Sequence, residues 1–227
     1  MPGPIYYEWL DRLHAALAPP TVIEIGVYNG VSLAKVRPPS IAIGVDPNPK
    51  IEFTLKAETH IFPETSDDFF ARQGPADILG NKPLGLGFID GLHVYEQALR
   101  DFINLEAYCG PKSVILFHDT VPLDEPTQRR TCETTFHTGD VWKIVPTLKE
   151  LRPDLDIFTI STAWTGLTVV TGLDPSSRVL KESYDSAVAK FADLPFSAIE
   201  EHMAPSLNMV AKDWAVVETR LKARGVL

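Results

Sequence analysis

Two short apolar runs of this chain, residues 86–90 and 113–118, end in acidic and imidazole side chains. Asp90 ends the first run, with His93 three residues later, and the second run leads into His118 and Asp119. If both runs are parallel strands of one open sheet, their carboxyl ends meet at the edge where ligands of such sheets bind. Two carboxylates there suit a hard divalent cation, Mg²⁺ above all, so we predict Asp90, His118 and Asp119 as its ligands. The alternative interpretation is structural, with Asp90 capping the next helix and Asp119 opening a turn.

His93 is the candidate general base, and with Asp90 it makes up the predicted catalytic pair. An imidazole titrates near neutral pH, and beside an acid at a strand end it can take a proton from a hydroxyl held on the same cation. His118 leaves three roles open: ligand of a softer ion such as manganese or iron, second base, or a hydrogen-bonded side chain behind the site. His60 and His202 have no such neighbours and are predicted to be structural or exposed.

A second group of residues surrounds a glycine turn near the start of the chain. Gly26 and Gly30 flank the turn, Glu24 lies two residues before it, and Asp46 ends the next apolar run. The spacing G-x-x-x-G differs from the G-x-G-x-x-G of dinucleotide-binding domains, which argues against a nicotinamide cofactor. A carboxylate at Glu24 suits a cationic ammonium group, and Asp46 can bind two ribose hydroxyls. Taken alone, however, two glycines and an acid also describe an ordinary turn with a capping residue.

A rhythm of apolar strand followed by amphipathic helix positions these residues and predicts a parallel sheet. A close pair of strands near the end, too near in sequence for a crossover helix, predicts an antiparallel hairpin. We therefore expect an α/β fold: an open, doubly wound, mostly parallel seven-stranded sheet of Rossmann-like type. The predicted strands are residues 21–26, 41–46, 59–63, 86–90, 113–118, 157–161 and 167–171, and the clearest helices are residues 93–108 and 139–151. Residues 1–175 form the predicted domain, and residues 176–227 a helical C-terminal extension packed on it that offers a surface for a homo-oligomer.

Composition limits the partners of the protein. The formal charge of −9 over 227 residues repels nucleic acid and anionic lipid. No targeting segment or run of about 18 apolar residues is visible, so neither membrane insertion nor export is expected. The two cysteines, Cys109 and Cys132, have no metal-ligand spacing and suit a reducing compartment. We expect a cytoplasmic protein that acts on a small molecule.

The pattern E-I-G-x-x-x-G-x-S, followed by G-V-D at the next strand end, resembles the cofactor signature of class I S-adenosylmethionine-dependent methyltransferases. The resemblance extends over most of residues 20–173. It implies that Asp46 binds the ribose and that the methionine part is lined by Glu24, Gly26, Tyr28, Asn29 and Gly30. The segment from Glu64 to Phe70 resembles the one that contacts adenine in catechol-type and macrolide-sugar O-methyltransferases. This resemblance implies that Ser66 and Asp67 contact the adenine base of the cofactor. Both residues also suit a helix N-terminus.

The pattern I-D-G-x-H-x-Y-x-x-x-x-x-D, with a later strand ending in H-D-T, resembles the group that includes macrolide-sugar and cephalosporin-pathway enzymes. In metal-dependent relatives the match to Asp90 binds metal, the match to His93 lies where a base is found, and the pair at 118 and 119 completes the coordination. The chain departs from that pattern in having His118 where an acid or amide is expected. Residues 138–143 resemble a border of the acceptor pocket, where Trp142 either stacks on a sugar or aromatic ring or covers the core.

Three hypotheses follow for the function. The first is a metal-assisted O-methyltransferase acting on a sugar, polyketide or phenolic hydroxyl. The second is a metal-independent methyltransferase acting on nitrogen or carbon, in which Asp90 and His93 orient the acceptor. The third is a non-catalytic module that keeps the fold for binding alone.

Overall fold

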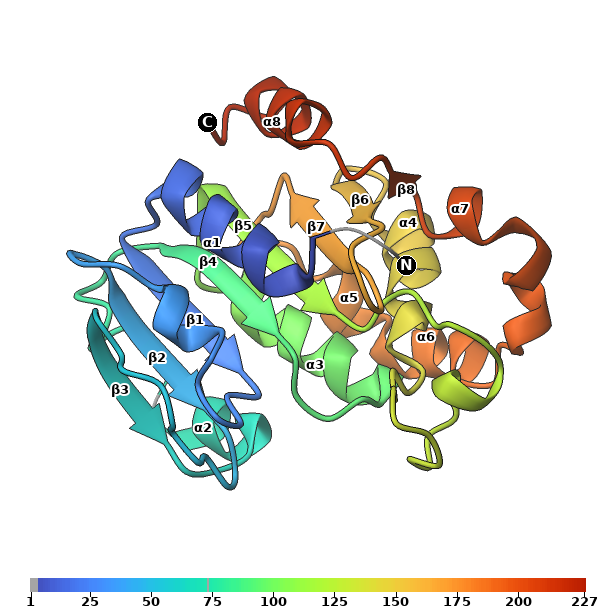
Figure 1. Ribbon diagram of the computed structural model, residues 1–227, viewed down its shortest axis with the longest axis horizontal. Coiled ribbons are helices and arrows are strands. Elements are labelled where there is room, and N and C mark those ends of the chain that lie inside the picture. The colour runs from blue at the N-terminus through green and yellow to red at the C-terminus, as the bar shows by residue number, and fades with distance from the viewer. Residues whose placement is uncertain (1–3, 73) are drawn as a thin grey trace.

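The computed structural model describes residues 4–72 and 74–227, and within them eight strands form one sheet (Figure 1). Their order across the sheet is β3-β2-β1-β4-β5-β7-β6-β8. The first five pair in parallel, whereas β7 runs antiparallel to both β5 and β6. The strands are β1 (Thr21–Ile25), β2 (Ile41–Val45), β3 (Glu58–Phe62), β4 (Leu84–Ile89), β5 (Cys109–His118), β6 (Asp156–Ile160), β7 (Leu167–Thr171) and β8 (Met209–Val210). The predicted mostly parallel sheet with an antiparallel hairpin is confirmed.

The strand count differs from the prediction, because the described sheet has eight strands and not seven. The added strand, β8, is only two residues long and pairs in parallel with the edge strand β6. It lies within residues 176–227, which were predicted to be helical, whereas the last helix begins only at Trp214. A two-residue strand carries too little alternation to be recognised from sequence.

Helices cover both faces of the sheet, as a doubly wound fold requires. One apolar cluster packs α2, α3, α4 and α6 on one face, and a second packs α1 and α8 on the other. Successive residues of β5 enter opposite clusters: Ile115 lies in the first and Leu116 in the second. The helices are α1 (Tyr6–Leu17), α2 (Ser66–Arg72), α3 (Tyr95–Glu106), α4 (Ile144–Leu151), α5 (Val179–Glu182), α6 (Tyr184–Phe191), α7 (Met203–Ser206) and α8 (Trp214–Ala223).

The register of the parallel strands lines up the residues that follow them. Ile25 pairs with both Val45 and Ile89, and Ile89 pairs with Phe117. The next residue of each strand, Gly26, Asp46, Asp90 and His118, therefore falls in one row along the carboxyl edge of the sheet. These four residues line one cleft along that edge.

Residues 176–227 pass from one face of the sheet to the other around its β6 edge. α6 packs in the first cluster, β8 extends the sheet, and α8 packs in the second cluster (Figure 1). In the described part of the chain no helix is both long and apolar enough to cross a membrane. Cys109 is buried and Cys132 exposed, and both are free thiols.

The first helix, α1, begins at Tyr6 beside the carboxyl edge of the sheet and contains a buried histidine, His14, near its other end. Tyr6 N donates to the carbonyl oxygen of Ala163 at 3.1 Å, beside a bridge between Ile5 and Ala163. Near the other end of α1, His14 is buried at 6% exposure. Burial, with the positive charge of Arg37 nearby, lowers the pKa of His14 to about 4.

This buried imidazole predicts a pH-dependent stability. Because the folded pKa of His14 lies below the unfolded value, only the unfolded state takes up the proton between pH 6.5 and about 4, so stability is lost as the pH falls across this range. Between pH 7 and pH 4.5 His14 should account for roughly 2 kcal/mol of lost unfolding free energy. Urea unfolding of His14→Leu at both pH values should show a smaller difference than the wild type, whereas the exposed control His202→Leu should match the wild type. Equal pH dependence in His14→Leu would contradict this role.

Candidate active site

A cleft of about 660 Å³ runs along the carboxyl edge of the sheet. It extends from the end of β2 and the start of α2 to the ends of β4 and β5, which is where ligands of open α/β sheets bind. Of the residues predicted from the sequence, the cleft is lined by Gly26, Tyr28, Asp46, Ser66, Asp90, His93, His118 and Asp119. Glu24, Asn29, Gly30 and Asp67 are not among its lining residues.

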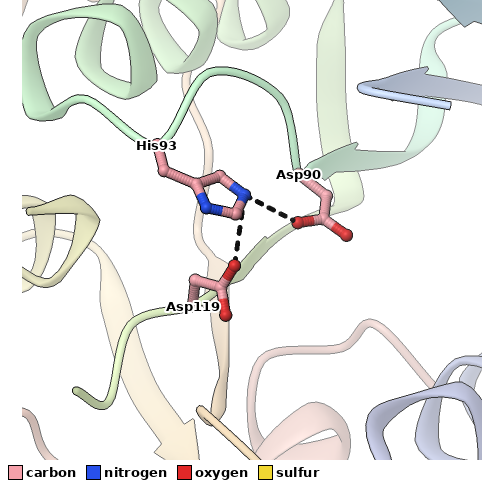
Figure 2. A group of neighbouring side chains, drawn as sticks. All are labelled: Asp90, His93 and Asp119. Atoms are coloured by element: carbon pink, nitrogen blue, oxygen red, sulfur yellow. Dashed lines mark ion pairs between the residues drawn. The ribbon is translucent and has the colours of Figure 1, made fainter. Parts of the chain in front are cut away.

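At one end of the cleft, Asp90, His93 and Asp119 point toward one another (Figure 2). His93 Nε2 lies 3.2 Å from Asp119 Oδ2 and 3.6 Å from Asp90 Oδ1. One potential ligand atom from each residue lies within 4.8 Å of the others. His93 Nδ1 donates to the carbonyl oxygen of His137 at 2.8 Å, which leaves Nε2 facing the carboxylates.

His118 also lines the cleft, contacts both carboxylates and has partners for both ring nitrogens. Its Nδ1 donates to Asp90 Oδ1 at 3.1 Å and lies 3.4 Å from Asp119 Oδ2. Its Nε2 lies 3.3 Å from the hydroxyl of Thr165, which itself donates to Asp119. The ring of Tyr6 stacks on that of His118 with centroids 3.7 Å apart. One group that could share a cation consists of Asp90, His93 and Asp119, and His118 contacts the same two carboxylates.

The charges of this cluster compensate one another. Burial opposes protonation of His93, but the hydrogen bond to Asp90 and the charge of Asp119 raise its pKa to about 9. For His118, burial is likewise outweighed by Asp90 and Asp119, which raise its pKa to about 10. Burial alone would raise the pKa of Asp90, yet the neighbouring His118 holds it below its usual range. The two carboxylates thus favour the protonated form of both imidazoles.

The glycine turn is fastened by the acid that ends the second strand. Asp46 Oδ2 accepts from the backbone N–H of Val27 at 2.9 Å and of Tyr28 at 2.8 Å, and Oδ1 accepts from Asn48 N at 2.7 Å. Gly26 has a φ of +85°, and a Cβ there would lie 2.0 Å from the carbonyl oxygen of Asp90. A side chain at position 26 is incompatible with this approach of the two backbones.

Glu24 lies beneath the turn, not in the cleft. It is 2% exposed, and Ser32 donates its hydroxyl to Glu24 Oε1. Burial, with the nearby charges of Asp90 and Asp46, raises the pKa of Glu24 well above its usual range despite that hydrogen bond. Its contacts therefore support the turn from below.

Residues 23–120 match the family model described as a methyltransferase domain. Solved structures with similar folds include the cofactor-bound Rv0187 from MTB, with 16% identity, 74% of this chain and 80% of that chain covered, and a TM-score of 0.56. The O-methyltransferase TomG from Streptomyces achromogenes, solved with SAM, has 16% identity, coverage of 73% and 78%, and a TM-score of 0.54. The O-methyltransferase from Bacillus cereus, solved with SAH, has 11% identity, coverage of 75% and 82%, and a TM-score of 0.52. Residues 23–120 are thus similar to a methyltransferase domain, and the solved structures share the fold of this chain.

A curated relative is far longer than this chain. The uncharacterized protein y4gI of Sinorhizobium fredii is 28% identical over 110 residues, which cover 47% of this chain and 11% of that protein. The chain thus spans about a tenth of that relative's length. The resemblance to class I S-adenosylmethionine-dependent methyltransferases drawn from the sequence is confirmed for the fold, and residues 23–120 match a methyltransferase domain model.

At the other end of the cleft, the two residues predicted to contact the adenine base, Ser66 and Asp67, point in different directions. Ser66 is buried and lines the cleft, whereas Asp67 turns to Arg100, with Oδ1 3.2 Å from Arg100 Nε. The fold also brings in residues that sequence reasoning missed: Tyr6, Gln97 and Asp101 line the cleft, and Thr165 holds Asp119. The family pattern ended on Asp101, which was the one available signal.

The histidines and the tryptophan outside this group fall as follows. His60 is partly exposed and pairs with Glu58, and His202 is exposed. Trp142 is fully buried, and its indole N–H donates to Gln128. Of the two interpretations of Trp142, the core interpretation is therefore correct, and its ring is not available for stacking on an acceptor.

Gly26→Ala should disrupt the fold at the turn, because the new Cβ must displace the backbone of β4. We expect a loss of unfolding free energy of at least roughly 2 kcal/mol, more than the cost of a left-handed alanine alone. Gly80→Ala is the matched control, since Gly80 also has a positive φ, of +62°, but nothing lies within 4 Å of its Cβ position. Equal losses in the two variants, measured by urea unfolding, would show that the close approach to Asp90 costs nothing.

Proposed function

We propose that this protein is an S-adenosylmethionine-dependent O-methyltransferase that acts on a small-molecule hydroxyl with the help of a divalent cation. The observation that carries the proposal is the single cleft, which joins the Asp46 end of the glycine turn to the cluster of Asp90, His93 and Asp119. A methyl donor and an acceptor hydroxyl must meet, and the two ends of this cleft provide for one each.

The cleft suits the cofactor in its shape and polar groups. Gly26 leaves the backbone open at the turn, and Asp46 lies at the rim, where its carboxylate can accept from ribose hydroxyls. Ser66 lies beyond Asp46, and Glu24 with Ser32 holds the turn from below. When bound, S-adenosylmethionine supplies a methyl group on a positively charged sulfur, which leaves as a neutral thioether.

The cluster suits a divalent cation of the oxygen-preferring kind. Ligand atoms that share an octahedral ion at about 2.1 Å lie about 3 Å apart, close to the 3.1 and 3.4 Å that separate His118 Nδ1 from the two carboxylates. Asp90 and Asp119 would hold the ion, Mg²⁺ or Mn²⁺, with His118 as a further candidate ligand, and His93 Nε2 would remain uncoordinated beside them. When bound, such an ion makes an acceptor hydroxyl more acidic.

His93 is the residue that takes the hydroxyl proton in this proposal. The carbonyl of His137 fixes its Nδ1 as the protonated nitrogen, so the free lone pair of a neutral ring belongs to Nε2, on the cleft side. Asp90 and Asp119 stabilise the imidazolium after proton transfer. Before the transfer, the same carboxylates disfavour the neutral form of His93, because they raise its pKa. A cation bound to the carboxylates would weaken this effect.

The acceptor has to suit a cleft with few positive charges. Among the described lining residues there is no lysine or arginine, and Tyr28 and Leu92 expose large apolar surfaces, at 68% and 66%. An uncharged sugar, polyketide or phenol fits better than a phosphorylated compound. The net charge of −9 also supports a protein that works without nucleic acid or membrane, in the cytoplasm. A homo-oligomer through the C-terminal helices belongs to the proposal as well.

Metal-independent methylation of nitrogen or carbon is the second candidate. It is favoured by the pairing of His93 and His118 with both carboxylates, which compensates their charge without an ion. In that case Asp90 and His93 orient the acceptor. A binding module without activity is the third candidate, and turnover of any acceptor would exclude it.

Asp46→Ala should weaken cofactor binding. Loss of hydrogen bonds to a charged group costs roughly 1–3 kcal/mol, or about 5- to 150-fold in Kd. Calorimetry with S-adenosylhomocysteine measures the change, with Asp67→Ala as a control, because Asp67 pairs with Arg100 outside the cleft. Unchanged affinity in Asp46→Ala would remove Asp46 from the cofactor site.

The metal and the base should separate in a second set of variants. Asp90→Asn and Asp119→Asn should lose binding of Mn²⁺, measured by calorimetry without acceptor, whereas the exposed control Asp185→Asn should bind as the wild type does. His93→Gln should lower turnover by about 10²- to 10⁴-fold, the usual range for one general base. Full wild-type turnover in chelator, together with a mild His93→Gln defect, would favour the metal-independent candidate.

A further inference from the structure

Asp101 is a buried carboxyl in the wall of the cleft, at the end away from the Asp90 cluster. It lies on α3, one turn after Gln97, and is 1% exposed. Ser66 Oγ donates to Asp101 Oδ1 at 2.6 Å, and Gln97 Nε2 donates to the same oxygen at 3.0 Å. Among the described hydrogen bonds, none ends on Oδ2. The carboxyl is thus held in place by one oxygen while the other keeps its accepting capacity.

The polar groups around Asp101 have already used their donors. The hydroxyl proton of Ser66 points to Asp101, and the Gln97 amide N–H groups are shared among Ser66, Asp67 and Asp101. The hydroxyl of Thr65, which also lines this end, donates to Asp68. This end of the cleft therefore presents an acceptor to a ligand, and these three side chains hold no spare donor to match a carbonyl.

The base of the cofactor would lie at this end, an inference that rests on the proposed function. In an adenosyl group the ribose stands between the base and the carbon that carries the sulfur. With the ribose at Asp46 and the transferred methyl group directed to Asp90 and His93, the base is directed the opposite way. The lining residues on that side are Pro47, Thr65, Ser66, Gln97 and Asp101.

We propose that Asp101 selects the adenine base by accepting a hydrogen bond from its exocyclic amine. Adenine offers an N–H donor at that position, whereas hypoxanthine carries a carbonyl oxygen there, which would face a carboxylate. Burial raises the pKa of Asp101 to about 6 against the hydrogen bonds from Ser66 and Gln97, so the carboxylate form still predominates at pH 7.5. A site that has a buried acceptor rejects the ligand that lacks the donor, because the acceptor is left unpaired.

Two ligands that differ only at this position test the assignment. S-adenosylhomocysteine and its deaminated analogue, S-inosylhomocysteine, are titrated by calorimetry at pH 7.5 into the wild-type protein, Asp101→Asn and Asp67→Asn. The wild type should prefer the adenosyl ligand by about tenfold or more. In Asp101→Asn the new amide N–H can donate to the carbonyl of the inosyl ligand, so the preference should fall to about threefold or less, or reverse. Asp67→Asn, on the exposed side of the same hydrogen-bond group, should keep the wild-type ratio.

The outcomes distinguish this assignment from the proposed function. If the wild type binds the adenosyl ligand but takes the inosyl ligand equally well, or if Asp101→Asn keeps the wild-type ratio, Asp101 does not read the base and the methyltransferase proposal stands. If the wild type binds neither ligand, both proposals fail. The wild-type comparison does not depend on a variant, and Asp101→Ser, which removes the carboxylate with a smaller side chain, provides a second variant should Asp101→Asn not fold.

Discussion

The approach of two backbones at Gly26 fixes where the functional side chains of this protein lie. A Cβ at that position would lie 2.0 Å from the carbonyl oxygen of Asp90, so only glycine lets the end of β1 come this close to the end of β4. The register then places Asp46 and His118 in the same row, one strand further on each side. Asp46 in turn holds the backbone that follows Gly26 through two N–H groups. The absence of a side chain at Gly26 and the carboxylate of Asp46 thus determine the backbone conformation at this part of the cleft.

Charge compensation is the second constraint, and it links the chemistry of the site to its burial. Asp90 and Asp119 are held together in a largely buried space, which is unfavourable unless positive charge accompanies them. His118 supplies part of it, and its ring has partners for both nitrogens and stacks on the ring of Tyr6. His93 supplies the other part. The two histidines are therefore not equivalent: the contacts of His118 keep its ring in place, whereas the one nitrogen of His93 that faces the cleft can exchange its partner for a ligand.

The sequence predicts the row of strand-end residues well, because apolar runs identify parallel strands and the carboxyl ends of such strands share one edge. It does not predict how the rings of the two histidines are oriented in the cleft, since that depends on the backbone of His137 and on Thr165, 44 and 47 residues away from His93 and His118. Tyr6 was invisible for the same reason: it reaches Asp90 across 84 residues of sequence, through an N-terminal helix with no chemical motif. Ser66 and Asp67 are consecutive residues of α2, so their side chains point in different directions. Ser66 points to Asp101 in the cleft, whereas Asp67 pairs with Arg100 outside it. Asp101 stood within a recognised pattern, but its use depends on the meeting of α2 and α3.

Helix α3 links His93, at one end of the cleft, to Asp101, at the other. His93 lies just before its first residue, Tyr95, and Asp101 lies six residues after that, roughly 9 Å further along the axis. The helix is anchored at its start by Asp140, whose carboxylate accepts from Tyr95 N at 2.7 Å, and at its end by Glu106, which pairs with the buried Arg152 at 2.7 Å. A helix held at both ends cannot slide along the sheet without breaking one of these buried contacts. The distance between His93 and the carboxyl of Asp101 is therefore set largely by the helix itself, and a ligand that reaches both residues has to match that length.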